Sequence, residues 1–266
     1  MAIVVVVVLV VVIISVTGSK APKSGNQGYP PVTPANPAVV QTLATVPAST
    51  IDAVGTGGNA VAGEVFTVKK DQPPLKIDGK PGAIFVGGLF CPLCGADRWA
   101  MVQAFSRFGT FTGLQQTTSS PVDSDPSTVT FDFTHATYSS PYIAFSPVER
   151  FGNDTYSQQV RTINEPLTAQ EAHSYAKYGT VGSVPYFNIG NKVFAQSAMY
   201  DPGLLTGNTW SQVAAALSNP KNPITQAIIG SANYITAGIC ATNGQQPANV
   251  CSASGVKAAA TAMGLS

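Results

Sequence analysis

Hydrophobic and polar positions follow three different patterns along this 266-residue chain. The first residues form an uninterrupted apolar run, and a segment rich in Pro, Thr, Ala, Gly, Ser and Asn follows it. From about residue 61, short apolar or alternating segments are separated by turn residues, which is typical of a folded domain. We therefore expect an anchor at residues 1–18, a linker at residues 19–60 and one folded domain at residues 61–266.

The apolar run at residues 2–16 reads AIVVVVVLVVVIISV and carries no charge. It is long for a β-strand and lacks the alternation of a half-buried one. With Thr17 and Gly18 it reaches the short end of a membrane span, which takes about 17–25 residues. No basic residue precedes it and no A-x-A-like cleavage site follows, so we expect a retained transmembrane signal anchor, with a cleaved signal peptide as the alternative.

The charges that flank this run do not favour export. Lys20 and Lys23 follow it, and the positive-inside rule alone would keep the domain in the cytoplasm. The segment at residues 19–60 nevertheless reads as an extended, Pro-rich tether, and two pairs of Cys suit an oxidising compartment. We expect a single-pass protein of the cell membrane with an extracytoplasmic domain.

Inside the domain, the apolar pattern predicts a mixture of strands and helices. The fully apolar run at residues 83–86 is typical of a buried central strand, and the segment after Cys91 has helical spacing up to Gly109. A strand predicted at residues 110–118 would complete a right-handed parallel unit. Further strands are expected at residues 64–68, 129–133, 142–145, 186–189 and 192–195, and further helices at residues 168–178, 210–217, 223–240 and 258–264.

Capping and turn residues mark some of these boundaries. Thr168 followed by Glu171 is a capping box that begins a helix. Gly190 with Asn191 is a two-residue hairpin turn, which would add antiparallel strands at one edge of a sheet. We therefore expect an α/β fold with a mixed central sheet, helices on both faces, an insertion and a C-terminal helical extension.

The charge content narrows the choice of partners. Only 10% of residues are charged, against about 25% in an average soluble domain. Lys plus Arg and Asp plus Glu nearly cancel, 14 against 13, so we expect neither a nucleic-acid partner nor an acidic tail. His135 and His173 are isolated in the sequence, and we expect neither a metal nor another cofactor.

Cys91 and Cys94 lie where a predicted strand enters a predicted helix. Unpaired backbone N–H groups and the helix dipole favour negative charge there, and they lower a thiol pKa from about 8.5 to about 3.5–7.5. Pro92 suits the first helical turn, where its missing N–H costs little. We expect Cys91 to be the exposed nucleophile and Cys94, one turn later, to be the buried thiol that resolves a mixed disulfide.

Two other interpretations of this pair stay open. C-x-x-C is half of a zinc site, although Cys240 and Cys251 lack that spacing. A purely structural Cys91–Cys94 disulfide would make no use of the strand-to-helix junction. Cys240 and Cys251 flank a polar loop with turn residues, so we expect a structural disulfide between them, with a redox relay to the first pair as the alternative.

The segment FCPLC at residues 90–94, followed later by Val184-Pro185, resembles the thioredoxin-like superfamily and is most similar to exported disulfide oxidoreductases. The resemblance implies a thioredoxin-like fold in which the Val184–Pro185 bond is cis and faces the thiols. It implies that Pro185 lines a substrate groove and that Val184 offers backbone groups to an extended peptide. Pro92 and Leu93 complete the expected substrate-binding residues.

A narrower likeness extends further along the chain. It is carried by the string CPLCGADRWAMVQAFSRFGTF from Cys91, YSS from Tyr138, GSVPYF from Gly182 and ANYITAGIC from Ala232. These strings are similar to an uncharacterised prokaryotic family, a domain of unknown function with a thioredoxin-like fold. The likeness implies the fold and does not indicate a substrate.

One position departs from typical thioredoxins. They carry an acidic residue six positions before the first Cys, which helps to move the proton of the resolving thiol, and here that position is Phe85. Either another group or water takes this role, or exchange is slow. Asp97 and Arg98 follow Cys94, and Arg98 is a candidate to stabilise a thiolate, but we expect a solvated ion pair on the helix surface. We expect Trp99 in the core.

These observations predict a membrane-tethered thiol–disulfide oxidoreductase that exchanges disulfides with extracytoplasmic proteins through Cys91 and Cys94. Its expected partners are protein thiol and disulfide substrates, a membrane redox partner that recycles it, and the membrane itself. The alternatives are a peptide-binding module of the same fold without turnover and a cell-surface structural module. The direction of exchange depends on the reduction potential of the pair.

Overall fold

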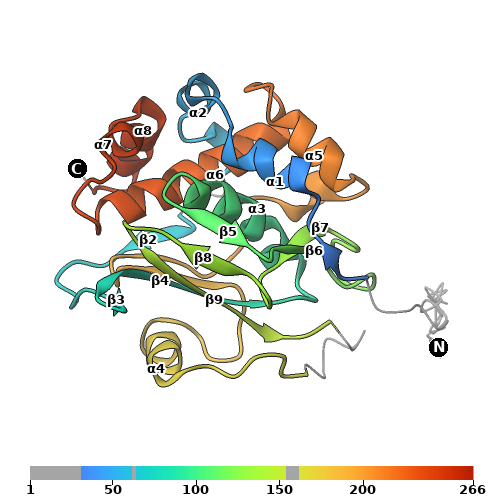
Figure 1. Cartoon of the computed structure of the whole chain (residues 1–266), viewed down its shortest axis with the longest axis horizontal. Coiled ribbons are helices and arrows are strands. Elements are labelled where there is room, and N and C mark those ends of the chain that lie inside the picture. Colours follow the sequence, from blue (N-terminus) through green and yellow to red (C-terminus); the bar gives the residue numbers. More distant parts are fainter. Residues whose placement is uncertain (1–30, 62–63, 154–161, 266) are drawn as a thin grey trace, which may run out of the picture.

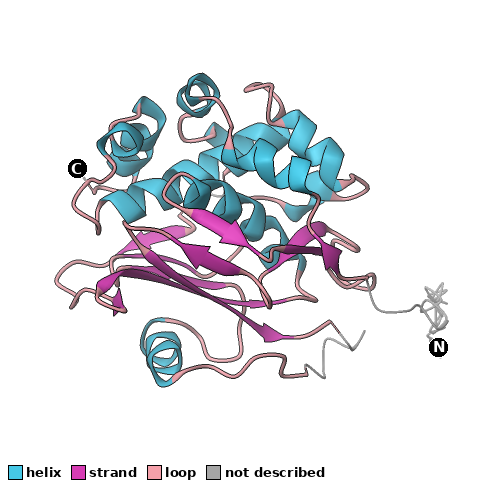
Figure 2. Cartoon of the chain, viewed as in Figure 1, coloured by secondary structure: helices cyan, strands magenta, loops and turns pink. Residues whose placement is uncertain are grey.

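The structure, a computed structural model, has a mixed α/β fold and describes residues 31–61, 64–153 and 162–265. The expected anchor at residues 1–18 lies outside these ranges, and within them no helix is long and apolar enough to cross a membrane. The central sheet has a thick layer of helices on one face and helix α4 (Ala169–Tyr178) on the other (Figure 1, Figure 2). The expected α/β class with helices on both faces is confirmed.

Six strands form the central sheet, namely β2 (Phe66–Val68), β3 (Lys76–Ile77), β4 (Lys80–Gly88), β9 (Ala144–Phe151), β10 (Tyr186–Ile189) and β11 (Val193–Ala195). Their order is β2-β11-β10-β4-β3, and β9 also pairs with β4. The residues of β4 from Ala83 to Val86 are fully buried, as the apolar run predicts. β4 runs antiparallel to β10 and parallel to β9, so the sheet is mixed.

The strand predicted at residues 110–118 does not pair with β4. It divides into β5 (Thr110–Thr112) and β6 (Gln115–Thr118), which belong to different sheets. Gly113 between them has a φ of +70°, and a Cβ atom there would lie 2.5 Å from the His135 carbonyl oxygen, so the chain turns where only glycine fits. The pairing partners are β8 (Thr137–Ser139) for β5, and β1 (Thr33–Pro34) and β7 (Val129–Asp132) for β6.

Helix α3 (Pro92–Ser106) lies at the centre of the thick helical layer. It packs against α6 (Pro223–Cys240) and β7, and every residue from Cys94 to Phe105 is buried. A helix enclosed in this way needs no polar face, because neither side of it meets water. The other helical elements of the layer are α1 (Pro37–Ala44), α2 (Ala48–Val54), η1 (Gly58–Ala60), η2 (Pro202–Leu205), α5 (Trp210–Ala216), α7 (Ala248–Cys251) and α8 (Ser254–Ala262).

The linker expected at residues 19–60 is wrong over its second half. Residues 19–30 lie outside the described ranges, but α1 and α2 are helices of the folded domain. α1 packs against α3 and α5, and α2 packs against α6 and α8. Val39 and Leu43 are buried, because their spacing places both on one face of α1. The burial of these side chains outweighs the Pro-rich composition on which the prediction depended.

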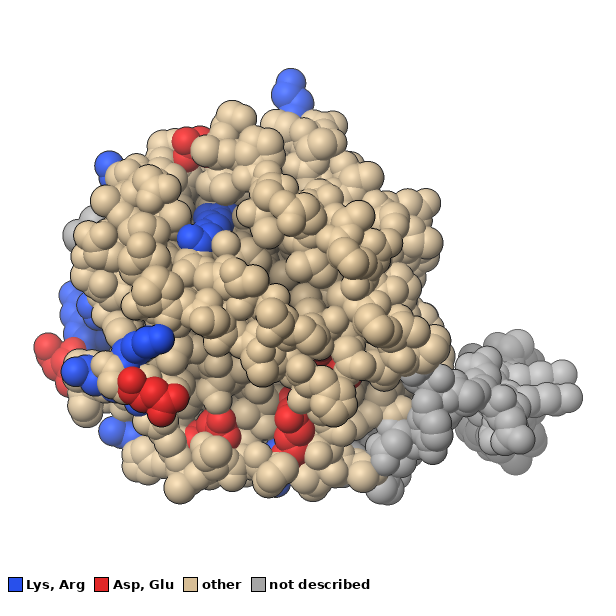
Figure 3. All heavy atoms as spheres, in the orientation of Figure 1, with Lys and Arg blue, Asp and Glu red and all other residues tan. Residues whose placement is uncertain are grey.

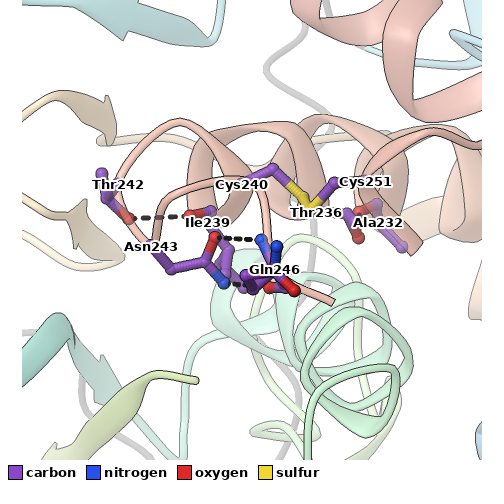
Figure 4. Close-up of a disulfide and its surroundings, with 8 residues drawn as sticks. All are labelled: Ala232, Thr236, Ile239, Cys240, Thr242, Asn243, Gln246 and Cys251. Carbon is purple, nitrogen blue, oxygen red and sulfur yellow. Dashed lines mark hydrogen bonds between the residues drawn. A yellow bond between two sulfur atoms is a disulfide. The ribbon is translucent and has the colours of Figure 1, made fainter. Parts of the chain in front are cut away.

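The expected disulfide between Cys240 and Cys251 is present (Figure 4). It joins the last residue of α6 to the end of α7, and both cysteines are buried. The intervening loop is held by hydrogen bonds between Asn243 and Gln246 (Figure 4). The terminal helix α8 begins earlier than the helix predicted at residues 258–264.

The surface carries few charged groups. On the face drawn in Figure 3, Lys, Arg, Asp and Glu side chains are sparse and gather mostly toward the lower left, while the helical half is covered mainly by uncharged atoms. This agrees with a sequence in which 10% of residues are charged and the formal net charge is +1.

Candidate functional site

The two free cysteines lie at the end of the central strand. β4 ends at Gly88, and Cys91 is the N-cap residue of α3. The Cys91 sulfur accepts a hydrogen bond from the backbone N–H of Cys94 at 3.3 Å. A sulfur in this position faces the unpaired N–H groups and the positive end of the helix dipole, which favour a thiolate. The strand-to-helix junction expected from the sequence is therefore the setting of both thiols.

Cys91 is less exposed than the sequence suggests. Its exposed fraction is 5%, and that of Cys94 is 0%. The Val184 carbonyl oxygen lies 3.9 Å from the Cys91 sulfur, and the Val184–Pro185 peptide bond is cis. The expectation of an exposed nucleophile is thus wrong for this state of the protein, because the segment before Pro185 and the first turn of α3 cover the sulfur.

The two thiols differ in acidity. The hydrogen bond with the Cys94 side chain lowers the pKa of Cys91, and although burial opposes this effect, the net direction is downward. The positive charge of Arg98 also lowers the pKa of Cys91. Burial raises the pKa of Cys94 well above its usual range, and its hydrogen bond with Cys91 raises it further. Cys91 is therefore the thiol that ionises first, and Cys94 keeps its proton.

The four expected substrate-binding residues lie around this junction with unequal exposure. Pro92 and Pro185 are buried, while Leu93 and Val184 are half-buried. Leu93 and Val184 therefore remain accessible beside Cys91. The side chain of Val181, which precedes Val184 in the same loop, is 70% exposed and adds apolar surface.

Arg98 does not form a solvated ion pair with Asp97, as the sequence suggests. It is fully buried and forms a two-pronged ion pair with Glu149, whose side chain is also 0% exposed. The Nε–Oε1 distance is 2.8 Å and the Nη2–Oε2 distance is 2.6 Å. Nη2 also donates to the Gly88 carbonyl oxygen at 3.0 Å, which fixes the guanidinium next to the last residue of β4.

Burial alone would lower the pKa of Arg98, but the adjacent Glu149 carboxylate raises it above its usual value. Arg98 therefore stays charged, and its charge acts on both thiols. The guanidinium carbon lies 5.8 Å from the centre of the Phe85 ring, so a buried cation lies next to Phe85. The alternative of a thiolate-stabilising Arg98 is the one that the geometry favours.

Asp97 is also fully buried. Its Oδ1 accepts a hydrogen bond from the Met199 backbone N–H at 2.8 Å. Oδ2 is buried and has no hydrogen-bond partner among the described residues. Burial raises the pKa of Asp97 well above its usual range, and a negative charge on Cys91 raises it further. Asp97 is thus electrostatically linked to Cys91.

Strand β7 holds the thiol helix from the side. The Thr130 hydroxyl donates to the Gly95 carbonyl oxygen at 2.8 Å, and the Trp99 indole N–H donates to the Val129 carbonyl oxygen at 2.9 Å. Trp99 is fully buried, so its predicted place in the core is confirmed. These bonds fix the first two turns of α3 relative to β7.

The Cys240–Cys251 disulfide lies on another side of the molecule from this junction. α7 and β7 are on opposite sides of the view in Figure 1, and the first turns of α3 are bonded to β7. This arrangement disfavours a redox relay between the two cysteine pairs. No group of three or more His, Cys, Asp or Glu residues that could hold a metal ion occurs in the described part of the chain.

Comparison with known proteins finds one family model that part of the chain resembles. Residues 67–185 match the family model described as Domain of unknown function (DUF929). The match begins in β2 and ends at Pro185, so it includes both free cysteines and excludes the Cys240–Cys251 disulfide. No curated protein and no solved structure matches the chain. The expected likeness to an uncharacterised family is therefore supported over these residues.

Glu149 is the residue of this site that the sequence does not indicate. It lies on β9, opposite Gly87 of β4. Its role depends on the pairing of two strands that are distant in sequence, and no local motif marks it.

Proposed function

We propose that this protein is a thiol–disulfide oxidoreductase of thioredoxin-like fold that works through Cys91 and Cys94. The observation that carries the proposal is the position of the Cys91 sulfur, which caps α3 and faces the Val184 carbonyl oxygen. The order of elements supports the fold, because the central strand leads into the thiol helix and an antiparallel hairpin follows the cis Val184–Pro185 bond.

The chemistry follows from the difference in acidity between the thiols. The Cys91 thiolate attacks one sulfur of a substrate disulfide, forms a mixed disulfide and releases the other substrate sulfur as a thiolate. Cys94 then attacks the Cys91 sulfur, which forms the Cys91–Cys94 disulfide and releases the second substrate thiol. The reverse sequence oxidises a substrate dithiol, and the reduction potential of the pair sets the direction.

The substrates of this reaction are extended segments of other proteins. A sulfur that is 5% exposed admits a thin polypeptide segment more readily than a folded surface. The half-buried Leu93 and Val184 form an apolar border beside it, and the exposed Val181 lies three residues before Val184 in the same loop. A substrate segment with apolar residues next to its cysteine would bury this border, and its backbone would run beside the loop before Pro185.

The reaction takes place outside the cytoplasm, on a domain tethered to the membrane. The apolar run at residues 2–16 supports the tether, and the Cys240–Cys251 disulfide supports an oxidising compartment. A membrane redox protein would recycle the Cys91–Cys94 pair. Protease added to intact cells should degrade the domain, and complete protection until the cells are lysed would contradict the outward orientation.

A trapping experiment tests the enzymatic function. The Cys94→Ala variant cannot resolve a mixed disulfide. Incubation with native, disulfide-bonded insulin should therefore yield a covalent adduct on Cys91 that dithiothreitol reverses. The matched Cys91→Ser variant should form no adduct. The unmodified protein should reduce insulin or refold a reduced, disulfide-containing substrate with turnover. No adduct on Cys94→Ala, together with no turnover by the unmodified protein, would refute the proposal.

A peptide-binding module without turnover is the second candidate, and the low exposure of Cys91 is the observation that favours it. Such a module would bind an extended apolar peptide equally well when Cys91 and Cys94 are both replaced by Ser. An oxidoreductase would lose its covalent intermediate in that double variant. Peptide binding by the double variant, combined with absent turnover in the unmodified protein, would favour the second candidate.

A further inference from the structure

A buried carboxyl group lies one helical turn beyond Cys94. Asp97 is 0% exposed, and its Oδ1 is satisfied by the Met199 N–H at 2.8 Å. Oδ2 is buried with no hydrogen-bond partner among the described residues. A buried and unpaired carboxylate oxygen destabilises the folded state, and a proton on that oxygen relieves most of the cost. The site is therefore suited to a group that gains and loses a proton.

The helix brings this carboxyl group close to the thiols. Residues at positions i and i+3 are neighbours on a helix surface, with Cβ atoms about 5–6 Å apart, and Cys94 and Asp97 stand in this relation on α3. The charged or titratable groups that act on Asp97 are Cys91 and Arg98 from the same helix and Tyr200 from the segment before η2.

Phe85 stands where typical thioredoxins carry an acidic residue, so another residue would have to accept the proton of Cys94. Phe85 is fully buried there and lies under the Arg98 guanidinium, which is paired with Glu149. Glu149 is thereby committed to two hydrogen bonds with Arg98. Of Asp97 and Glu149, the two carboxylates near the junction that are 0% exposed, Asp97 is the one with an oxygen that has no hydrogen-bond partner among the described residues.

We propose that Asp97 takes up the proton of Cys94 during disulfide exchange and returns it when the reaction runs in reverse. This inference rests on the proposed oxidoreductase function. In the reductive direction, the Cys91 thiolate first forms a mixed disulfide with the substrate. The Cys94 proton then moves to the Asp97 carboxylate, and the Cys94 thiolate attacks the Cys91 sulfur. The bond between Cys91 and the substrate breaks, and the departing substrate thiolate receives the proton from Asp97.

The charge on Cys91 determines at which stage Asp97 can accept the proton of Cys94. While Cys91 is a thiolate, its negative charge raises the pKa of Asp97. Formation of the mixed disulfide removes that charge, so the pKa of Asp97 falls. Asp97 then gives up its own proton, which the first departing substrate thiolate takes, and the carboxylate becomes available as a base. Proton uptake is thereby favoured at the stage at which Cys94 has to lose its proton.

A two-phase reaction with 5,5′-dithiobis(2-nitrobenzoate) separates the two steps. Formation of the mixed disulfide on Cys91 releases one thionitrobenzoate, and attack by Cys94 releases a second. Asp97→Asn keeps an oxygen for the Met199 N–H but cannot take a proton. We expect an unchanged first phase and a second phase slowed about 10²-fold near neutral pH, with its pH dependence lost. Asp52→Asn is the matched control, because exposed Asp52 also accepts one backbone N–H, from Gly255 at 2.9 Å.

The possible outcomes separate this inference from the function on which it rests. If the unmodified protein releases only the first thionitrobenzoate, the oxidoreductase function and the role of Asp97 both fail. If it releases both, and Asp97→Asn releases both at the same rates, only the role of Asp97 is refuted.

A second measurement covers the case in which Asp97→Asn does not fold. Carbon-13 NMR of the Asp97 carboxyl group in the unmodified protein should give a higher pKa in the dithiol form than in the disulfide form. Titration near the usual value of about 3.9 in both forms would overturn the inference.

Discussion

Replacement of Glu149 by Gln tests the ion pair that lies below the thiol junction. The substitution keeps the shape of the side chain and one carbonyl oxygen, but it removes the negative charge that faces Arg98. Both side chains are 0% exposed, and the guanidinium donates hydrogen bonds to the two carboxylate oxygens at 2.8 and 2.6 Å. Glu149→Gln would therefore leave a buried cation without its ion-pair partner.

The expected loss is large. Removal of one partner from a buried ion pair costs about 3–5 kcal/mol, out of a total folding stability of about 5–15 kcal/mol. At about 2–4 °C per kcal/mol for a domain of about 150–250 residues, the Tm should fall by about 6–20 °C. The double variant with Arg98→Met and Glu149→Met removes both charges and should recover most of the loss, because apolar pairs of similar volume often replace buried ion pairs at little cost.

Urea and thermal unfolding of the reduced protein, followed by circular dichroism, would measure these differences. Glu64→Gln is the matched control, since Glu64 is exposed and should leave the free energy of unfolding unchanged. A loss below about 1 kcal/mol for Glu149→Gln, the range of exposed ion pairs, would refute the reasoning. A double variant no more stable than Glu149→Gln would also refute it.

Three further predictions follow from the site and from the N-terminal helices. Arg98→Met should raise the pKa of the Cys91 thiol, because the Arg98 charge lowers it, and an unchanged pH profile of iodoacetamide labelling would contradict this. Because burial raises the pKa of Asp97 in the folded protein, the folded state binds more protons than the unfolded state above about pH 4, and stability should fall as the pH rises from there through the folded pKa. Urea unfolding at a series of pH values should show this fall, and Asp97→Asn should remove it. Leu43→Ala should cost about 2–5 kcal/mol, because Leu43 is 0% exposed, whereas Ala at the exposed Gln41 should have no measurable effect.

Local sequence signals predict those parts of the fold that depend on near neighbours. The capping box of Thr168 and Glu171 begins α4, with both of its reciprocal hydrogen bonds present. The turn at Gly190 and Asn191 joins β10 to β11, although Ile189 pairs with Val193, so three residues rather than the predicted two separate the strands. The apolar run at residues 83–86 lies within the buried part of β4. In each case the deciding interactions lie within a few residues, so the pattern contains them.

The parts that the sequence did not reveal depend on contacts between distant residues. Glu149 is 51 residues from Arg98 in sequence, and it faces Arg98 only because β9, rather than residues 110–118, lies beside β4. The same dependence explains the error for Asp97. It reads as a surface residue until α3 is enclosed by the elements packed around it, and α1 belongs to the segment that the composition assigned to a linker.

The scarcity of surface charge has a consequence for how quickly partners are found. With 10% charged residues, a formal net charge of +1 and a helical face that is mainly uncharged (Figure 3), the domain exerts little long-range attraction on an approaching chain. Association should then proceed at the unsteered rate of about 10⁵–10⁶ M⁻¹ s⁻¹, with little dependence on ionic strength. Selection among substrates would then depend on the contacts made after the encounter. Substrates would differ in the lifetime of the segment bound beside Cys91 rather than in its association rate.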